Sequence, residues 1–173
     1  MPAIDNILKQ LNEKFSADII GTETPNERRL FVDIKPDRVR DISNEMIALG
    51  GRYMVSIGTD FSDVDGTMQL IHTFAFDNDN LLTGIRMSVP ADNPVFMSIT
   101  PDIPSAGWSE REYMDLLGMK FIDHPKPKRL VLSDDWPEGV YPLRKEVPWN
   151  LMPPGAEDVA YQLDECPEGC TIV

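Results

Sequence analysis

Residues 65–76 read DGTMQLIHTFAF, a tight turn followed by an alternating strand. Asp65-Gly66 is a strong hairpin signal, because both residues tolerate the positive φ angles of a two-residue turn. Beyond the turn, large side chains occupy every second position and so share one face of an extended chain. They are Met68, Leu70, His72, Phe74 and Phe76. The stretch predicts a half-buried strand whose histidine packs in a core rather than binding a ligand.

Further strands flank this one. Arg52–Phe61 precedes the turn, and Leu81–Val89 follows the turn-forming Asn78-Asp79-Asn80. Three consecutive strands joined by tight turns predict an antiparallel meander. Two shorter β-rich runs, Asp18–Thr22 and Arg29–Ile34, come before it.

Two helices are predicted to cover this sheet. Apolar residues recur at helical spacing through residues 3–15. Pro36 suits the first turn of a second helix, which Gly50-Gly51 ends. We therefore expect an α+β domain over residues 1–107, an antiparallel sheet meander with two helices on one face.

A Pro-rich extended C-terminal arm follows. Eight of the fifteen prolines lie in residues 120–173, and proline interrupts both helices and ladders. Large apolar residues are nevertheless spaced through the arm, namely Trp136, Tyr141, Leu143, Trp149 and Leu151. Residues 133–173 are therefore predicted to lie on a partner protein. The alternative is an arm folded back over its own sheet.

Charge and hydropathy exclude several classes. The formal net charge is -13, from 29 acidic and 16 basic residues, so a phosphate backbone would be repelled and no nucleic acid is expected. No stretch approaches the roughly 20 apolar residues of a membrane helix. The N-terminus lacks the basic start and apolar run of a signal peptide. We expect a cytoplasmic location, with membrane contact only through partners.

Residues 108–118 predict a short, well-specified helix. Ser109 and Glu112 have the spacing of a capping box, and Trp108 and Tyr113 that of a hydrophobic staple. Gly118 is a natural C-terminal stop.

Charged residues continue this segment to residue 132. Arg111 and Asp115 are four residues apart and are expected to pair on the helix surface. Beyond the helix lies the densest basic patch of an acidic chain, made of Lys120, His124, Lys126, Lys128 and Arg129.

The spacing of these residues resembles a known signature, that of the 30 kDa subunit of NADH:quinone oxidoreductase (respiratory complex I). The matching positions are Glu110-Arg111-Glu112, Asp115, Leu116-Leu117, His124, Lys128 and Leu130-Val131. The flanking Trp108, Pro125, Asp135-Trp136 and Pro142-Leu143-Arg144-Lys145 agree as well, and the resemblance covers residues 1–149.

The resemblance implies a structural subunit of the hydrophilic arm, with no catalytic residues of its own. Such a subunit packs against the large catalytic subunit, which lines a quinone or [NiFe] site, and neighbours a small iron–sulfur subunit. Fe-S clusters and [NiFe] or quinone would belong to those partners. The sequence agrees, because it contains no nucleotide-binding glycine motif and no four-cysteine iron–sulfur spacing. The expected partner interface comprises Glu110, Arg111, Glu112, Asp115, His124, Lys128, Arg129, Trp136, Leu143, Arg144 and Lys145.

Two departures from the respiratory pattern favour a subtype. Asp123 stands where respiratory members usually have glycine before the His-Pro pair, and Pro137–Arg144 replaces their Gly-His-Pro-Leu-Arg-Lys. That replacement resembles energy-converting, membrane-bound [NiFe] hydrogenases. The alternative is the 30 kDa subunit of a NADH- or other quinone-linked dehydrogenase.

Two further functions compete with the structural one, a free-standing enzyme and a regulatory module that visits a complex reversibly. Glu110, Glu112 and His124 are residue types used for acid–base catalysis, so a free-standing enzyme is a rival hypothesis. Cys166 and Cys170 form half a metal site at best, because zinc needs two more ligands. We expect two reduced thiols and no metal site in this chain.

Overall fold

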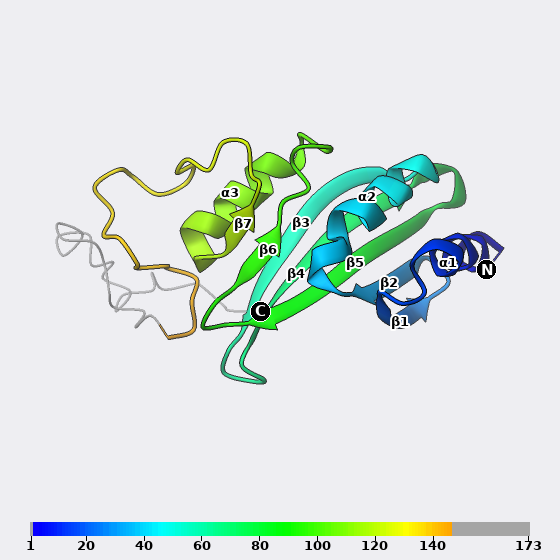
Figure 1. The fold of residues 1–173 in the computed structure, drawn as a ribbon, viewed down its shortest axis with the longest axis horizontal. Coiled ribbons are helices and arrows are strands. Elements are labelled where there is room, and N and C mark those ends of the chain that lie inside the picture. The colour runs from blue at the N-terminus through cyan, green and yellow to red at the C-terminus, as the bar shows by residue number, and fades with distance from the viewer. Residues whose placement is uncertain (1, 147–173) are drawn as a thin grey trace, which may run out of the picture.

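The computed structural model describes residues 2–146 and has an α+β fold (Figure 1). Its helices are α1 (Pro2–Phe15), α2 (Val39–Ala48) and α3 (Ala106–Leu117), with short 3₁₀ turns at Pro36–Arg38 and Asp77–Asp79. Its strands are β1 (Ile19–Asn26), β2 (Arg29–Ile34), β3 (Arg52–Phe61), β4 (Thr67–Phe76), β5 (Leu81–Pro90), β6 (Val95–Met97) and β7 (Lys120–Ile122).

The main sheet has five strands in the order β1-β2-β5-β4-β3. The predicted antiparallel meander is confirmed as β3-β4-β5, and β1 and β2 form an antiparallel hairpin. The hairpin joins the meander through a parallel pairing of β2 with β5, in which Val32 lies opposite Ile85. The connection through α2, which lies over the sheet in Figure 1, leads from β2 to β3 at the far edge, and β3 and then β5 run in the same direction as β2. The sheet is therefore mostly, but not entirely, antiparallel.

The core lies between the helices and one face of this sheet. Leu11 of α1 and Met46 of α2 are fully buried there, together with Leu30, Leu70 and Phe74 from the strands. Burying such side chains contributes roughly 1.5–3 kcal/mol each. The two predicted covering helices are thus confirmed, and the sequence placed the inward face of β4 correctly.

His72 is part of this core, as the alternating pattern predicts. Its Nδ1 lies 2.7 Å from the Ser56 hydroxyl, which in turn lies 2.8 Å from the Tyr53 hydroxyl. Burial lowers the pKa of His72 to about 3, because the charged imidazolium would be removed from water. His72 is therefore a neutral core residue at ordinary pH.

The chain after β5 builds a smaller layer around α3. β6 and β7 pair in parallel, and α3 lies between them in sequence. Residues 123–146 contain no helix or strand and run beside α3 (Figure 1). Across residues 2–146, none of the helices has the length and apolar character needed to cross a bilayer.

The described part of the arm lies against its own domain. The Leu143 N–H donates to the Leu116 carbonyl (3.0 Å), and the Lys145 N–H donates to the Asp60 carboxylate (2.9 Å). For residues 133–146 the structure thus has the fold-back arrangement that the sequence left open. Trp149 and Leu151 lie outside the described residues.

Candidate functional site: the α3 network

One side of α3 fixes the helix on the sheet. The Tyr113 hydroxyl donates a hydrogen bond to the Ser56 carbonyl (2.8 Å). Its ring lies over Gly58, where an added Cβ atom would be only 2.8 Å from the ring. Any larger residue at position 58 would push α3 away from β3, so the close approach depends on this glycine.

The predicted capping box at the start of α3 is wrong. The helix begins at Ala106, and its N-cap Ser105 makes no side-chain capping hydrogen bond. Ser109 and Glu112 therefore lie inside the helix instead of closing its N-terminus. The C-terminal prediction is confirmed, because Gly118 caps the helix with a left-handed backbone (φ 68°).

The predicted hydrophobic staple is wrong as well. Tyr113 packs on β3, whereas Trp108 is 66% exposed and lies beside Arg111. Helical periodicity explains the separation, since residues five apart on a helix point in different directions. With the helix starting earlier, Trp108 is a helical residue and not the residue that precedes the cap.

The start of α3 is held by Glu110 instead. This side chain is fully buried, and its carboxylate accepts hydrogen bonds from Ser98 Oγ (2.5 Å), the Ile99 N–H (2.9 Å) and Thr100 Oγ1 (2.8 Å). A buried charge is tolerated only when several donors replace its water. Glu110 therefore ties α3 to the loop that follows β6.

His124 completes this buried cluster. Its Nδ1 accepts the N–H of Lys126 (3.1 Å), and its Nε2 lies 3.8 Å from a Glu110 oxygen. The accepting role of Nδ1 places the ring proton on Nε2, facing the Glu110 carboxylate. The structure thus brings together two predicted site residues that lie fourteen positions apart.

Arg111 and Asp115 hold the segment after β7. Arg111 donates from Nε to the Lys128 carbonyl and from Nη2 to the Arg129 carbonyl, both at 2.7 Å. Asp115 Oδ2 accepts the backbone N–H groups of residues 130, 131 and 132 at 2.7, 2.8 and 3.3 Å. The predicted ion pair between Arg111 and Asp115 is wrong, because each side chain binds backbone groups that have no strand or helix partner.

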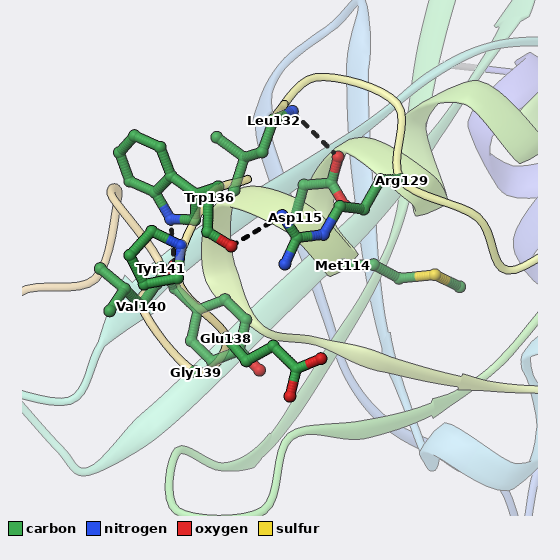
Figure 2. A pocket seen from close by; sticks show the side chains of 10 residues that line it. Met114, Asp115, Arg129, Leu132, Trp136, Glu138, Gly139, Val140 and Tyr141 are labelled. Carbon is green, nitrogen blue, oxygen red and sulfur yellow. Dashed lines mark hydrogen bonds between the residues drawn. The ribbon is translucent and has the colours of Figure 1, made fainter. Parts of the chain in front are cut away.

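Arg129 and Trp136 shape the loop that comes next. Arg129 Nη1 donates to the carbonyls of Ser133 (2.7 Å) and Trp136 (3.0 Å), while Trp136 Nε1 donates to the Val140 carbonyl (2.8 Å). Figure 2 shows these side chains around a cavity of about 330 Å³ beside α3. Three charged side chains line it, and two of them, Asp115 and Arg129, are bound to backbone groups of the loop, while the third, Glu138, is exposed.

The last described residues reach the ends of β3 and β5. Arg144 Nη1 donates to the Ala91 carbonyl (3.0 Å), and Lys145 binds Asp60 through its backbone N–H. Burial raises the pKa of Asp60, but hydrogen bonds from Ser62 and Lys145 and the charge of Arg144 outweigh it and leave that pKa below its usual value. Leu143 is exposed in this stretch.

Sequence reasoning missed several members of the network. Ser98, Thr100 and Asp60 lie far from the signature and carry no motif of their own. Two predicted site residues, Glu112 and Lys128, have no side-chain hydrogen bond in the network just described, and Lys128 is exposed. The partner-interface role of all the predicted site residues stays a prediction.

The buried acid and base groups of the network bind other groups of the same chain. Glu110 faces buried donors, and neither Glu110 nor His124 lines the cavity of Figure 2. Within residues 2–146 no group of three or more His, Cys, Asp or Glu side chains could hold a metal ion. Cys166 and Cys170 lie outside the described residues.

The fold and the α3 network define the class of protein. The chain belongs to the family described as the respiratory-chain NADH dehydrogenase 30 Kd subunit, whose model matches residues 32–151. The resemblance inferred from the signature residues is thereby confirmed. Relatives in this class are subunits of complex I-like respiratory complexes and of hydrogenases.

Particular relatives come from both kinds of complex. The chain is 30% identical over 141 residues to formate hydrogenlyase subunit 5 of Escherichia coli, covering 80% of this chain and 25% of that protein. It is 28% identical over 159 residues to the membrane-bound hydrogenase subunit beta of Pyrococcus furiosus, covering 88% and 92%. It is 29% identical over 170 residues to a NADH-quinone oxidoreductase subunit of Roseiflexus sp., covering 94% and 92%. The chain thus spans only 25–28% of the length of two of its curated relatives.

Solved structures show the same fold. A chain of the membrane-bound sulfane sulfur reductase, an archaeal respiratory membrane complex, superposes with a TM-score of 0.73 at 20% identity, covering 97% of this chain and 95% of that one. A trypsin-resistant fragment of Nqo5 superposes with a TM-score of 0.60 at 21% identity, covering 72% and 98%.

Proposed function

We propose that this chain is a non-catalytic structural subunit in the hydrophilic arm of a complex I-like, membrane-bound oxidoreductase. It docks on the large catalytic subunit and neighbours a small iron–sulfur subunit. The redox centres, Fe-S clusters with [NiFe] or quinone, belong to those partners. The assembly lies on the cytoplasmic side of the membrane, and this chain meets the membrane only through its partners.

A difference in length among the relatives carries this proposal. In formate hydrogenlyase subunit 5 the matched region is 25% of a longer chain, whereas the membrane-bound hydrogenase subunit beta matches over 92% of its length. In one relative this domain is part of a longer chain, and in another it is a separate subunit. The separate subunit is expected to bind the counterpart of the region that follows or precedes the domain in the longer chain.

The network around α3 supports a structural role over acid–base catalysis. Glu110 and His124 are buried and bind groups of the same chain, so a substrate has no path to them without opening the fold. Lys128, Leu143 and Lys145 are exposed beside the network and are the predicted interface residues best placed to meet another protein. The arm from residue 133 onward contributes further contacts.

We favour the energy-converting [NiFe] hydrogenase version, on the sequence of Pro137–Arg144. Asp123 is weaker evidence for it, because its backbone has φ 61°, which glycine adopts freely and aspartate tolerates. Both residues adopt this angle, glycine with less strain. The second candidate is the 30 kDa subunit of a quinone-linked dehydrogenase, and the 29% identity to the Roseiflexus protein over 94% of this chain favours it.

Copurification from gently solubilised native membranes tests the proposal. With an affinity tag on this chain, mass spectrometry is expected to identify a large catalytic subunit and a small iron–sulfur subunit in equal amounts. A large subunit with four cysteine ligands for nickel establishes the hydrogenase version, and one without them establishes the quinone-linked version. Recovery of this chain alone, after washing that leaves other membrane complexes intact, would overturn the structural role.

A truncation tests the arm within the same assay. A chain ending at Arg129 is expected to keep the sheet domain folded and to lose most of the copurified large subunit. Because the removed residues also bind Asp115 and Asp60 of the same chain, cooperative urea unfolding and retained amide protection of α3 are the controls for folding. Full copurification by the truncated chain would show that the arm is not an interface.

A further inference from the structure

We infer that Trp108 is the anchor by which α3 inserts into an apolar pocket with an acidic rim on the large partner subunit, and that Arg111 positions the indole. This inference rests on the proposed function and deepens it by naming the contact residue and the chemistry of the surface it meets. Trp108 was not among the interface residues predicted from the signature.

The exposure of Trp108 is the first observation. Its side chain is 66% exposed on a regular helix, although the other face of the same helix is packed on β3. Tryptophan and arginine are the residues that most often carry the binding energy of protein interfaces. A single exposed apolar residue is ordinary on a protein surface, so the exposure alone decides nothing.

The second observation is that the indole is held in place. The Arg111 guanidinium carbon lies 5.8 Å from the centre of the Trp108 ring, within the range of a cation–π contact. The same guanidinium donates two hydrogen bonds of 2.7 Å to the carbonyls of Lys128 and Arg129. The indole therefore lies on a planar group that is itself fixed to the backbone, which reduces the entropy lost on binding.

Asp115 extends this support along the helix. Trp108, Arg111 and Asp115 occupy positions i, i+3 and i+7, so they share one stripe of α3. Asp115 accepts the backbone N–H groups of Val131 and of its two neighbours, and Val131 is 52% exposed. Arg111 and Asp115 thus position two exposed apolar side chains and do not themselves need to reach the partner.

Charge indicates what covers this surface. The chain carries a net charge of -13, yet the segment beside the stripe carries Lys126, Lys128 and Arg129, and the first two are exposed. A basic rim around an apolar anchor favours an acidic rim on the partner. An anionic membrane is disfavoured by the net charge, and a symmetric dimer would place this basic segment against itself.

A comparison of alanine variants at two exposed apolar residues tests the anchor. Trp108→Ala is compared with Val64→Ala in the tagged, full-length chain, because Val64 is 74% exposed in the turn between β3 and β4. Trp108→Ala is expected to lower the affinity for the purified large subunit by about 10- to 30-fold, as a hot-spot residue does. Val64→Ala is expected to change it less than about twofold, and Trp108→Phe to recover part of the loss. Urea unfolding of each variant confirms that the fold is unchanged.

A double-mutant cycle tests the positioning role of Arg111. Arg111→Lys keeps the charge and loses the planar fork, so it is expected to weaken binding by about 3- to 10-fold. The same change made in the Trp108→Ala chain is expected to have little further effect, because the anchor is already gone. Additive losses would overturn the positioning role, since a merely structural effect of Arg111 does not depend on Trp108.

Salt dependence tests the acidic rim. Binding of the native chain is expected to weaken as salt rises from about 50 to 500 mM, and Trp108→Ala to keep the same slope. The double variant Lys126→Gln/Lys128→Gln is expected to reduce that slope. A slope that these lysines do not change would overturn the charge assignment.

The remaining outcomes separate the anchor from the proposed function. If the native chain binds the large subunit and Trp108→Ala binds it equally well, the anchor is overturned and the structural role stands. If the native chain binds no large subunit, the proposed function fails first. A dimer of the isolated chain that Trp108→Ala dissociates would assign the surface to a second copy and would also overturn the anchor.

Discussion

The sheet under α1 and α2 and the network around α3 are stabilised in different ways. In the sheet, buried apolar residues such as Leu70, Phe74 and Ile85 pack beneath the helices, on strands whose backbone groups pair with one another. Around α3, the charged side chains Glu110 and Asp115 accept backbone hydrogen bonds from segments without regular structure. An irregular segment therefore keeps one shape only where particular side chains satisfy its backbone.

This difference explains the residue types of the signature. A hydrophobic core tolerates exchange among apolar residues of similar volume, because packing is not directional. A carboxylate that accepts three N–H groups has no equivalent replacement, because hydrogen bonds fix distance and direction. Four predictions test this contrast, from the largest expected effect on stability to the smallest.

The largest change concerns the sheet core and pH. Burial lowers the pKa of His72 to about 3, whereas an unfolded histidine has its ordinary pKa near 6.5. The unfolded state therefore binds a proton below about pH 6.5 that the folded state does not, and stability falls as pH drops towards 3. The free energy of unfolding is expected to fall by about 1.4 kcal/mol per pH unit, reaching a loss of roughly 4–5 kcal/mol at pH 3.

Urea unfolding measured between pH 6.5 and 4.5 checks this slope while most carboxylates stay ionised. His72→Gln is the matched variant, because glutamine is polar and does not titrate. Its stability is expected to vary much less over this window. An unchanged slope in His72→Gln would assign the acid sensitivity to other groups.

The second prediction concerns the start of α3. Glu110→Ala removes the acceptor of Ser98, Ile99 and Thr100, and buried donors without partners are costly. We expect the free energy of unfolding to fall by about 3 kcal/mol, with faster amide exchange in the loop at residues 98–100. The half-buried neighbour Glu112→Ala is the control, with an expected change of about 0.5 kcal/mol or less. Equal loss of protection in β4 would show that the two regions are not separable.

The third prediction concerns the segment after β7. Asp115→Asn keeps an oxygen in place but loses the charge that strengthens three backbone hydrogen bonds. We expect the free energy of local opening, measured by hydrogen exchange, to fall by about 1–2 kcal/mol at the amides of residues 130–132 and not elsewhere. The exposed Asp134→Asn serves as the control and should change nothing there. Protection that survives in Asp115→Asn would mean that packing, not Asp115, shapes the segment.

The smallest change concerns Asp123, whose backbone lies in the left-handed region (φ 61°). Asp123→Gly relieves the strain of a side chain there, while the exposed ion pair with Arg40 contributes little. We expect a gain of about 0.5 kcal/mol in the free energy of unfolding. Asp123→Val is the opposing variant, with an expected loss of about 1–2 kcal/mol, because a β-branched residue is strained at this angle. If both variants raise the free energy of unfolding, or both lower it, the argument from the backbone angle is contradicted.

Regular elements were predictable because their signals are local. The period-2 pattern of Thr67–Phe76 and the turn at Asp65-Gly66 involve neighbours in the chain, and both elements are found where expected. Gly118 ends α3 for the same reason. The start of α3 was mispredicted because Ser109 and Glu112 fit a capping box locally, while Glu110 is bound by a loop ten to twelve positions upstream.

Patterns along the chain were enough to assign the five strands of the main sheet and the two covering helices, because periodicity and turn residues are signals between neighbours. The family came from the resemblance of the signature residues to a known pattern, and β6 and β7 were not predicted. The fold was needed to learn that β2 pairs in parallel with β5, that Glu110 faces His124, and that Arg111 binds backbone carbonyls beside an exposed Trp108. These are contacts between segments that lie far apart in the sequence. A polar side chain can form several alternative hydrogen bonds, and only the fold decides which partner lies within its reach.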